Sequence, residues 1–250
     1  MVVLHGIEVS CSYNGKEKTK GGYAHFCCFG TFNDNHTTYY YKNYLQLQKD
    51  ISNLIKNYSL VQFNHPLFSR LLDSEFIKLN GFHLIEVYNH KDYYEETGIQ
   101  NAELLIRTLL NHNKKLLVTA GDDFHGPYKN CKTDKCFGGF LMVNANKNEQ
   151  DIINSIKNGE FYASCGPEIF DYRICGRKIK IKTSKVKNII FLTNKRKCKN
   201  IFDDNDKEIN YGEYVLSGEE FYVWCKVVDK NGKMAWTQPI YIDNNNYFKS

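Results

Sequence analysis

The sequence predicts an α/β protein that is followed by a small antiparallel β domain, and two observations lead to this expectation. In residues 1–167, short apolar segments typical of strands alternate with segments of helical period. In residues 168–250 the helical segments are absent, and segments in which apolar residues recur at every second position are separated by turn residues. Strands that alternate with helices favour βα units around a mostly parallel sheet or barrel. We therefore expect an α/β domain over residues 1–167 and a β domain over residues 168–250.

Each element of the expected α/β domain is predicted from local patterns. The expected strands are short and apolar and cover residues 6–10, 24–29, 60–63, 82–87, 116–120 and 140–143. Apolar side chains at helical spacing predict helices over residues 44–57 and 101–113. A third helix is expected to start at Asn148, a good N-cap residue, and to end at Gly159, which suits a left-handed end.

The expected β domain shows alternation of another kind. Phe221, Val223, Cys225 and Val227 recur at every second position, so they should share one face of a strand. A turn is expected at residues 229–233, where Asp, Asn and Gly cluster.

A basic strand is also expected in this domain, because Lys178, Lys180 and Lys182 alternate with isoleucines. Two interpretations stay open: the solvated face of a sheet, and a basic platform for a phosphate-rich substrate.

Composition narrows the class of protein. With 42% hydrophobic and 24% charged residues, the chain has the composition of a globular domain rather than a disordered one. It has no apolar run near the roughly 20 residues that a membrane helix needs, and no basic start followed by an apolar region. The nine cysteines are scattered, which favours reduced thiols and a location in the cytoplasm.

Imidazoles and carboxylates lie in or just after several expected strands. Glu8 lies in the first, His25 in the second and His65 after the third, while Asp123 and His125 follow the fifth. The carboxyl ends of strands in α/β folds gather at one rim, where sites are built. Histidines and carboxylates on such a rim suit Zn²⁺, Mn²⁺ or Fe²⁺ in a hydrolytic centre.

These residues stand inside a series of short motifs in a familiar order. The chain resembles the polymerase and histidinol phosphatase (PHP) family of metal-dependent phosphoesterases, of the stand-alone type that ends in a small β domain. The similar segments include a Gly-x-Glu strand, a His strand, an Asn-His-Pro turn and an Asp-x-His turn, and they cover residues 6–10, 23–26, 64–66, 85–89, 122–126, 159–167 and 229–240.

The resemblance implies a distorted (β/α)₇ barrel with two or three metal ions and hydrolysis of phosphoesters. It implies that Glu8, His25, His65, Asp123 and His125 are metal ligands, with Asp123 and His125 at the catalytic centre.

Three further residues have less direct expected roles. Glu86 is either part of the site or a buried carboxylate satisfied by backbone N–H groups. Asp122 is expected to orient a metal ligand. Arg70 follows the His65 turn, where it either meets substrate phosphate or is a solvated arginine at the start of a helix.

One departure from the family concerns the start of the chain. The family opens with a His-x-His strand and an Asp-His pair, both before the Gly-x-Glu strand, which here begins at residue 6. The chain contains no His-x-His, so we expect an N-terminally incomplete barrel that lacks about two βα units and part of the ligand set.

The expected function is that of a divalent-metal-dependent phosphoesterase acting on nucleotides, nucleic-acid ends or other phosphorylated small molecules, with enzymatic activity expected once the missing N-terminal motif is supplied. One alternative is a non-catalytic remnant that binds only metal or nucleotide. Another is a nucleic-acid-binding module that uses the lysine-rich β domain. The number of bound ions separates the first two: two or three favour the enzyme, and one or none the remnant.

Overall fold

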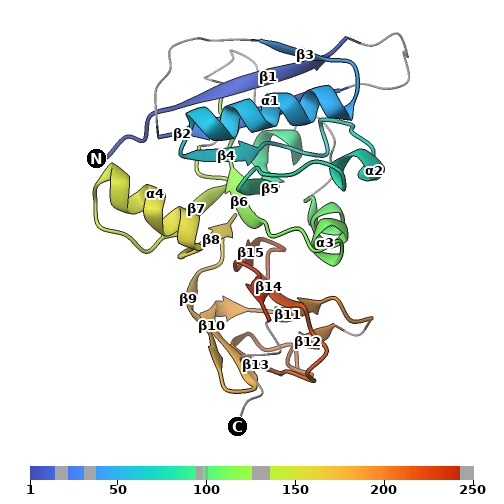
Figure 1. Cartoon of the computed structure of the whole chain (residues 1–250). Coiled ribbons are helices and arrows are strands. Elements are labelled where there is room, and N and C mark those ends of the chain that lie inside the picture. The colour runs from blue at the N-terminus through green and yellow to red at the C-terminus, as the bar shows by residue number, and fades with distance from the viewer. Residues whose placement is uncertain are drawn as a thin grey trace.

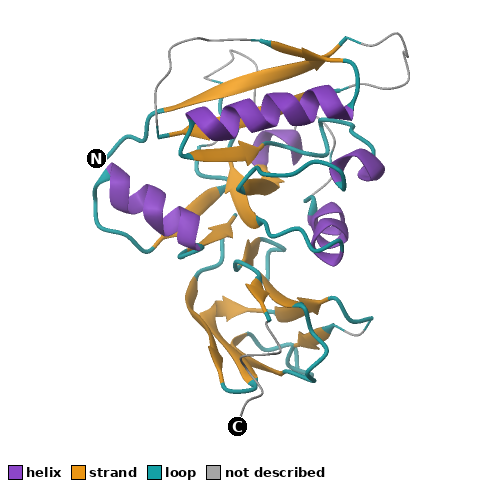
Figure 2. Ribbon diagram, in the orientation of Figure 1, coloured by secondary structure: helices purple, strands orange, loops and turns teal. Residues whose placement is uncertain are grey.

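The computed structural model describes residues 1–14, 22–30, 38–93, 98, 101–125, 136–196 and 198–242. The strands form three sheets (Figure 1). Figure 2 shows that the four α-helices lie within residues 44–158 of the described chain, whereas the described part that follows residue 168 consists of strands and loops.

The first sheet has six strands in the order β3-β1-β2-β4-β5-β6. These are β1 (Gly6–Tyr13), β2 (Tyr23–Phe29), β3 (Tyr39–Tyr41), β4 (Leu60–Phe63), β5 (Leu84–Asn89) and β6 (Leu117–Gly121). The pairs β1–β2 and β2–β4 are antiparallel, while β1–β3, β4–β5 and β5–β6 are parallel. The connections carry α1 (Tyr44–Asn57), α2 (Asp73–Phe76) and α3 (Glu103–Asn111).

Local sequence signals for the helices are confirmed. Helix α1 buries Leu47, Ile51 and Leu54 in the main core. Helix α4 (Glu149–Asn158) begins after Asn148, whose side chain accepts a hydrogen bond from the N–H of Asp151, and ends at Gly159 with φ of 75°.

The expected (β/α)₇ barrel is wrong. Among the described residues, ten strand pairs are antiparallel and three are parallel, and the first sheet is open. The alternation of strands with helices indicates where elements lie but does not determine strand direction. On the open side of β6, the Gln238 amide hydrogen-bonds both the N–H (2.7 Å) and the carbonyl (2.9 Å) of Val118. The Tyr241 hydroxyl likewise accepts a hydrogen bond from the N–H of Leu116 and donates one to its carbonyl. Side chains therefore bind the backbone groups at the edge of β6 that a neighbouring strand would bind in a barrel.

The other two sheets contain only antiparallel pairs. The larger has the order β12-β11-β14-β15-β8-β7, with β16 also on β14, and the smaller has the order β13-β10-β9. Their strands are β7 (Phe140–Val143), β8 (Phe161–Ser164), β9 (Ile169–Cys175), β10 (Lys178–Val186), β11 (Asn188–Thr193), β12 (Lys199–Ile201), β13 (Ile209–Val215), β14 (Tyr222–Val228), β15 (Met234–Trp236) and β16 (Ile240–Tyr241). The larger sheet contains strands from both sides of residue 167, and the division into two domains stays a prediction.

Strand β14 joins two apolar cores, because both of its faces are buried. Val223 and Cys225 pack in the core between the two antiparallel sheets, while Trp224 packs in the main core with α1 and the first sheet. Trp224 also donates a hydrogen bond from its indole to the Thr237 carbonyl at 2.9 Å. Phe221, which the period-two pattern places on the inward face, is 62% exposed and precedes the strand.

Candidate metal centre

Strand register brings Glu8 and His25 to the same face of the first sheet. Glu8 of β1 is opposite Cys27 of β2, two residues from His25, so Glu8 and His25 are diagonal neighbours. The alternate residues Val9 and Phe26 point to the other face, into the core. The polar face of an antiparallel strand pair therefore supplies two of the side chains, in place of the expected barrel rim.

His65 reaches this face through a tight turn after β4. The N–H of Asn64 donates to the carbonyl of His25 at 2.9 Å, which extends the β2–β4 pairing by one residue. His65 then adopts a positive φ of 25°, a conformation that costs free energy for a residue with a side chain. Its N–H donates to the Glu86 carboxylate at 2.7 Å, and its carbonyl accepts from the N–H of Phe68 at 2.9 Å. These hydrogen bonds fix the turn.

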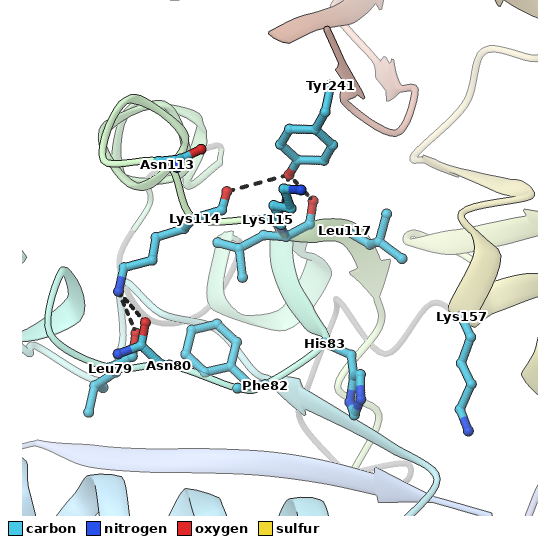
Figure 3. A pocket seen from close by; sticks show the side chains of 12 residues that line it. Leu79, Asn80, Phe82, His83, Asn113, Lys114, Lys115, Leu117, Lys157 and Tyr241 are labelled. Atoms are coloured by element: carbon cyan, nitrogen blue, oxygen red, sulfur yellow. Dashed lines mark hydrogen bonds between the residues drawn. The ribbon is translucent and has the colours of Figure 1, made fainter. Parts of the chain in front are cut away.

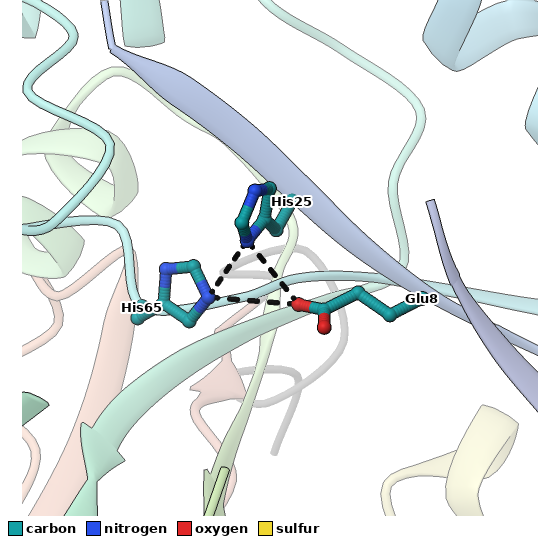
Figure 4. Close-up of side chains that lie close together, drawn as sticks. All are labelled: Glu8, His25 and His65. Carbon is teal, nitrogen blue, oxygen red and sulfur yellow. Dashed lines mark hydrogen bonds and ion pairs between the residues drawn. The ribbon is translucent and has the colours of Figure 1, made fainter. Parts of the chain in front are cut away.

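Glu8, His25 and His65 converge on one point (Figure 4). Oε1 of Glu8 lies 3.4 Å from Nδ1 of His25 and 3.6 Å from Nε2 of His65, and the two nitrogens are 3.3 Å apart. Tetrahedral ligands at bond lengths of 2.0–2.2 Å are separated from one another by roughly 3.4 Å. The three atoms therefore have the spacing that one tetrahedral ion requires.

The charges of the three side chains support this arrangement. Hydrogen bonds from His25 and then His65 lower the pKa of Glu8 well below its usual range, so the carboxylate is ionised. Burial alone lowers the pKa of His65, but its contact with Glu8 and the charges of Glu86 and Asp123 outweigh burial and raise it. An electronegative pocket of this kind favours a cation between the three ligand atoms.

Within the described part of the chain, Nδ1 of His65, the ring nitrogen that does not face Glu8, lacks the hydrogen bond that is usual in metal sites. A ligating histidine normally donates its other N–H to a carboxylate, carbonyl or water. Nδ1 of His65 is buried and has no protein partner among the described residues. The hydrogen bond from the His65 backbone to Glu86 thus orients this residue more directly than any contact of its ring does.

Asn64 orients Glu8, a role that the sequence motif did not reveal. Its amide nitrogen donates to Oε1 of Glu8 at 2.9 Å and to the Cys27 sulfur at 3.0 Å, and its oxygen accepts from Gln62 at 3.0 Å. Burial raises the pKa of Cys27 to about 12, so the neighbouring thiol stays protonated at neutral pH. Gln62, Cys27 and Glu8 lie side by side on three neighbouring strands because of the antiparallel register of β4, β2 and β1. The sequence pattern did not predict this register.

Asp123 and His125 form a pair of their own beside the three-residue cluster. His125 Nδ1 lies 3.5 Å from Asp123 Oδ1 and 2.6 Å from the Asp123 carbonyl, and the His125 side chain is 44% exposed. Asp123 has a positive φ of 52°; burial raises its pKa, opposed by the charges of His65 and His125. Among the residues that the structure describes, the converging ligand atoms belong to Glu8, His25 and His65, and the expected ligand role of Asp123 and His125 stays a prediction.

Glu86 is a buried carboxylate behind the cluster. It accepts hydrogen bonds from the N–H of His65 and from the Asn89 amide at 3.0 Å. Burial raises its pKa to about 7, although these hydrogen bonds oppose the shift. A Cβ at Gly121 would come within 2.7 Å of its Oε1 atom, so glycine leaves room for this carboxylate. Glu86 therefore positions His65 through the backbone.

Asp122 and Arg70 lie apart from the converging ligand atoms. The Asp122 carboxylate accepts backbone hydrogen bonds from residues 137–139, at 2.5–2.8 Å, and so anchors that loop. Arg70 is exposed and has a positive φ of 53° at the end of the His65 turn.

Comparisons with protein-family models, with curated proteins and with solved structures found no match to this chain. The likeness to PHP phosphoesterases therefore rests on the short motifs alone. Within the described ranges, no helix combines the length and the apolar character that crossing a membrane would require.

Proposed function

We propose that this chain binds one divalent transition-metal ion through Glu8, His25 and His65 and uses it to hydrolyse phosphoesters. The observation that carries the proposal is the 3.3–3.6 Å spacing of the three ligand atoms. Two histidines and one glutamate are a ligand set of catalytic zinc sites, which keep a fourth position open. The same donors also accept Mn²⁺ or Fe²⁺.

The surrounding residues have separate tasks in this proposal. A divalent ion would supply Lewis-acid chemistry at the centre. Asn64 holds the Glu8 carboxylate and Glu86 holds the His65 backbone, so both ligands are fixed before an ion binds. Asp123 lies within electrostatic range of His65, and its carboxyl is the group to which we assign proton transfer to a leaving oxygen.

The substrate class rests on the motif resemblance, which supports nucleotides, nucleic-acid ends or other phosphorylated small molecules. A location in the cytoplasm is part of the same proposal, and the free cysteines of the described residues support it.

A non-catalytic metal- or nucleotide-binding protein is the second candidate, and the number of converging ligands favours it. The described residues bring together three side chains for one ion, whereas the resemblance implies two or three ions. The nucleic-acid-binding alternative has less support, because Glu213 pairs with Lys178 at 2.9 Å and with Lys180 at 3.9 Å on the basic strand.

Activity on generic phosphoesters separates these candidates. With Zn²⁺ or Mn²⁺, the wild-type chain should hydrolyse para-nitrophenyl phosphate or its bis-ester, and a chelator should stop turnover reversibly. Glu8→Gln should lower turnover on the order of 100-fold or more, because it removes the charge of one ligand. His112→Gln, a change at the exposed histidine that follows the last residue of α3, is the matched control and should leave turnover unchanged.

Two outcomes would contradict the enzymatic proposal. One is equal turnover by the wild-type and Glu8→Gln chains. The other is binding of one ion with no turnover of either ester, which would establish the non-catalytic candidate instead.

A further inference from the structure

A second site lies at the opposite end of the parallel strands from the metal centre. A cavity of about 530 Å³ opens where residues 82–83 lead into β5 and residues 114–116 lead into β6 (Figure 3). His65 follows the carboxyl end of β4, which is parallel to β5, whereas this cavity lies at the amino ends of β5 and β6. The cavity is therefore separate from the candidate metal centre.

The rim of the cavity is cationic. Lys114, Lys115 and Lys157 line it, and none of the described lining residues carries a carboxylate. Lys114 donates hydrogen bonds to the Leu79 carbonyl at 3.1 Å and to Asn80 at 2.5 Å, so it holds the wall. Lys115 and Lys157 are exposed and make no ion pair within the described ranges, which leaves both charges available to a ligand.

His83 adds a directed hydrogen-bond donor. Its Nδ1 accepts the N–H of Val61 at 3.2 Å, and this contact assigns the ring proton of the neutral imidazole to Nε2. Burial and the charge of Lys157 lower the pKa of His83, which keeps the ring neutral. The half-buried ring lines the cavity, so Nε2–H is a fixed donor there.

The floor of the cavity is apolar. Phe82 and Leu116 are buried beneath it, and Leu117 and the ring of Tyr241 complete it. The Tyr241 hydroxyl is engaged by the backbone of Leu116, so the ring presents apolar surface to the cavity. Ligand sites commonly combine such an apolar lining with a few convergent polar groups.

We propose that this cavity binds a small molecule in which a phosphate group adjoins an aromatic body, of the nucleoside monophosphate class. The phosphate lies between Lys115, Lys157 and the Nε2–H of His83, and the aromatic body covers the Phe82 and Tyr241 side of the floor. Lys115 and Lys157, which make no ion pair among the described residues, supply two positive charges, and the neutral His83 ring supplies one hydrogen-bond donor. Together they balance the roughly two negative charges of a phosphate group.

Calorimetric titration with adenosine monophosphate tests the proposal. With a chelator present to keep the metal centre empty, one molecule should bind per chain, and Lys115→Gln with Lys157→Gln should weaken binding at least about tenfold, because the rim loses two charges. His83→Asn keeps an acceptor for Val61 but loses the Nε2 donor, and should weaken binding by a smaller factor. The matched control replaces Lys185 and Lys230, two exposed lysines of the β part, by glutamine and should bind within about twofold of wild type.

Further titrations distinguish the parts of the ligand and the two sites. Inorganic phosphate should bind more weakly than adenosine monophosphate, and adenosine more weakly than inorganic phosphate, because the cationic rim dominates. In the same chelator, Glu8→Gln should bind adenosine monophosphate like wild type. The proposal is overturned if no saturable binding occurs at millimolar concentration, if the control pair loses as much affinity as the rim pair, or if Glu8→Gln abolishes binding.

Discussion

Replacing His65 with alanine should weaken Zn²⁺ binding on the order of 100-fold or more, as measured by competition with a chromogenic chelator. His65 is the most buried of the three ligands, with 4% of its side chain exposed. Its position is fixed by the Glu86 hydrogen bond and by a positive φ, so the substitution removes a donor that is held in place before the ion binds. Glu8→Gln and His25→Ala should cause losses of the same order, since each removes one of three donors.

The control separates metal binding from folding. His112→Ala changes an exposed histidine outside the cluster and should leave Zn²⁺ affinity within about threefold of wild type. Circular dichroism should show that all variants keep the wild-type secondary structure. Affinities within threefold of wild type for all three ligand variants would contradict the proposed centre.

Glu220→Ala should destabilise the chain by about 2–3 kcal/mol at pH 7, measured by urea unfolding. Glu220 has no exposed surface and lies between β13 and β14. Its carboxylate accepts hydrogen bonds from the Tyr214 hydroxyl at 2.7 Å, from both the hydroxyl and N–H of Ser217, and from the next two backbone N–H groups. Alanine would remove the acceptor shared by these donors, which lie in the turn between β13 and β14.

The effect of Glu220 should also depend on pH. Burial raises its pKa, but the hydrogen bonds outweigh burial and lower it from 4.5 to about 2. The folded state therefore binds this proton less readily than the unfolded state, and the carboxylate stabilises the fold fully above pH 4.5. The stability difference between wild type and Glu220→Ala should narrow as pH falls from 4.5 towards 2.

Glu208→Ala is the control for this experiment, because Glu208 is exposed and makes no hydrogen bond or ion pair within the described residues. Its free energy of unfolding should stay within about 0.5 kcal/mol of wild type at each pH. A loss below 1 kcal/mol for Glu220→Ala, or a loss that does not change with pH, would show that the carboxylate does not hold this turn.

Local signals predicted the elements of this fold better than their arrangement. The helix ends at Asn148 and Gly159 depend on neighbouring residues only, and such patterns are readable in sequence. The direction of β2 against β1 depends on long-range pairing, which no local pattern encodes. Strand β3 was missed because three successive tyrosines show no alternation of apolar and polar residues. Gln238 satisfies the edge of β6 from 120 residues away, so no local motif could replace the expected barrel with an open sheet.

The candidate site was predictable to the same limited extent. Short motifs pointed to Glu8, His25 and His65, because imidazoles and a carboxylate in strands of one sheet are chemically distinctive. Asn64 can hydrogen-bond Glu8 because of the antiparallel strand register. Asp122 binds the backbone of a loop that lies 15–17 residues later in the chain. Both are tertiary contacts, which sequence spacing does not determine.

Anomalous diffraction at the zinc absorption edge, from crystals grown with Zn²⁺, locates the bound ion directly. One strong peak should lie about 2.0–2.2 Å from Oε1 of Glu8, Nδ1 of His25 and Nε2 of His65. The absence of a peak there, or a peak bound by Asp123 and His125 without these three residues, would contradict the proposed metal centre.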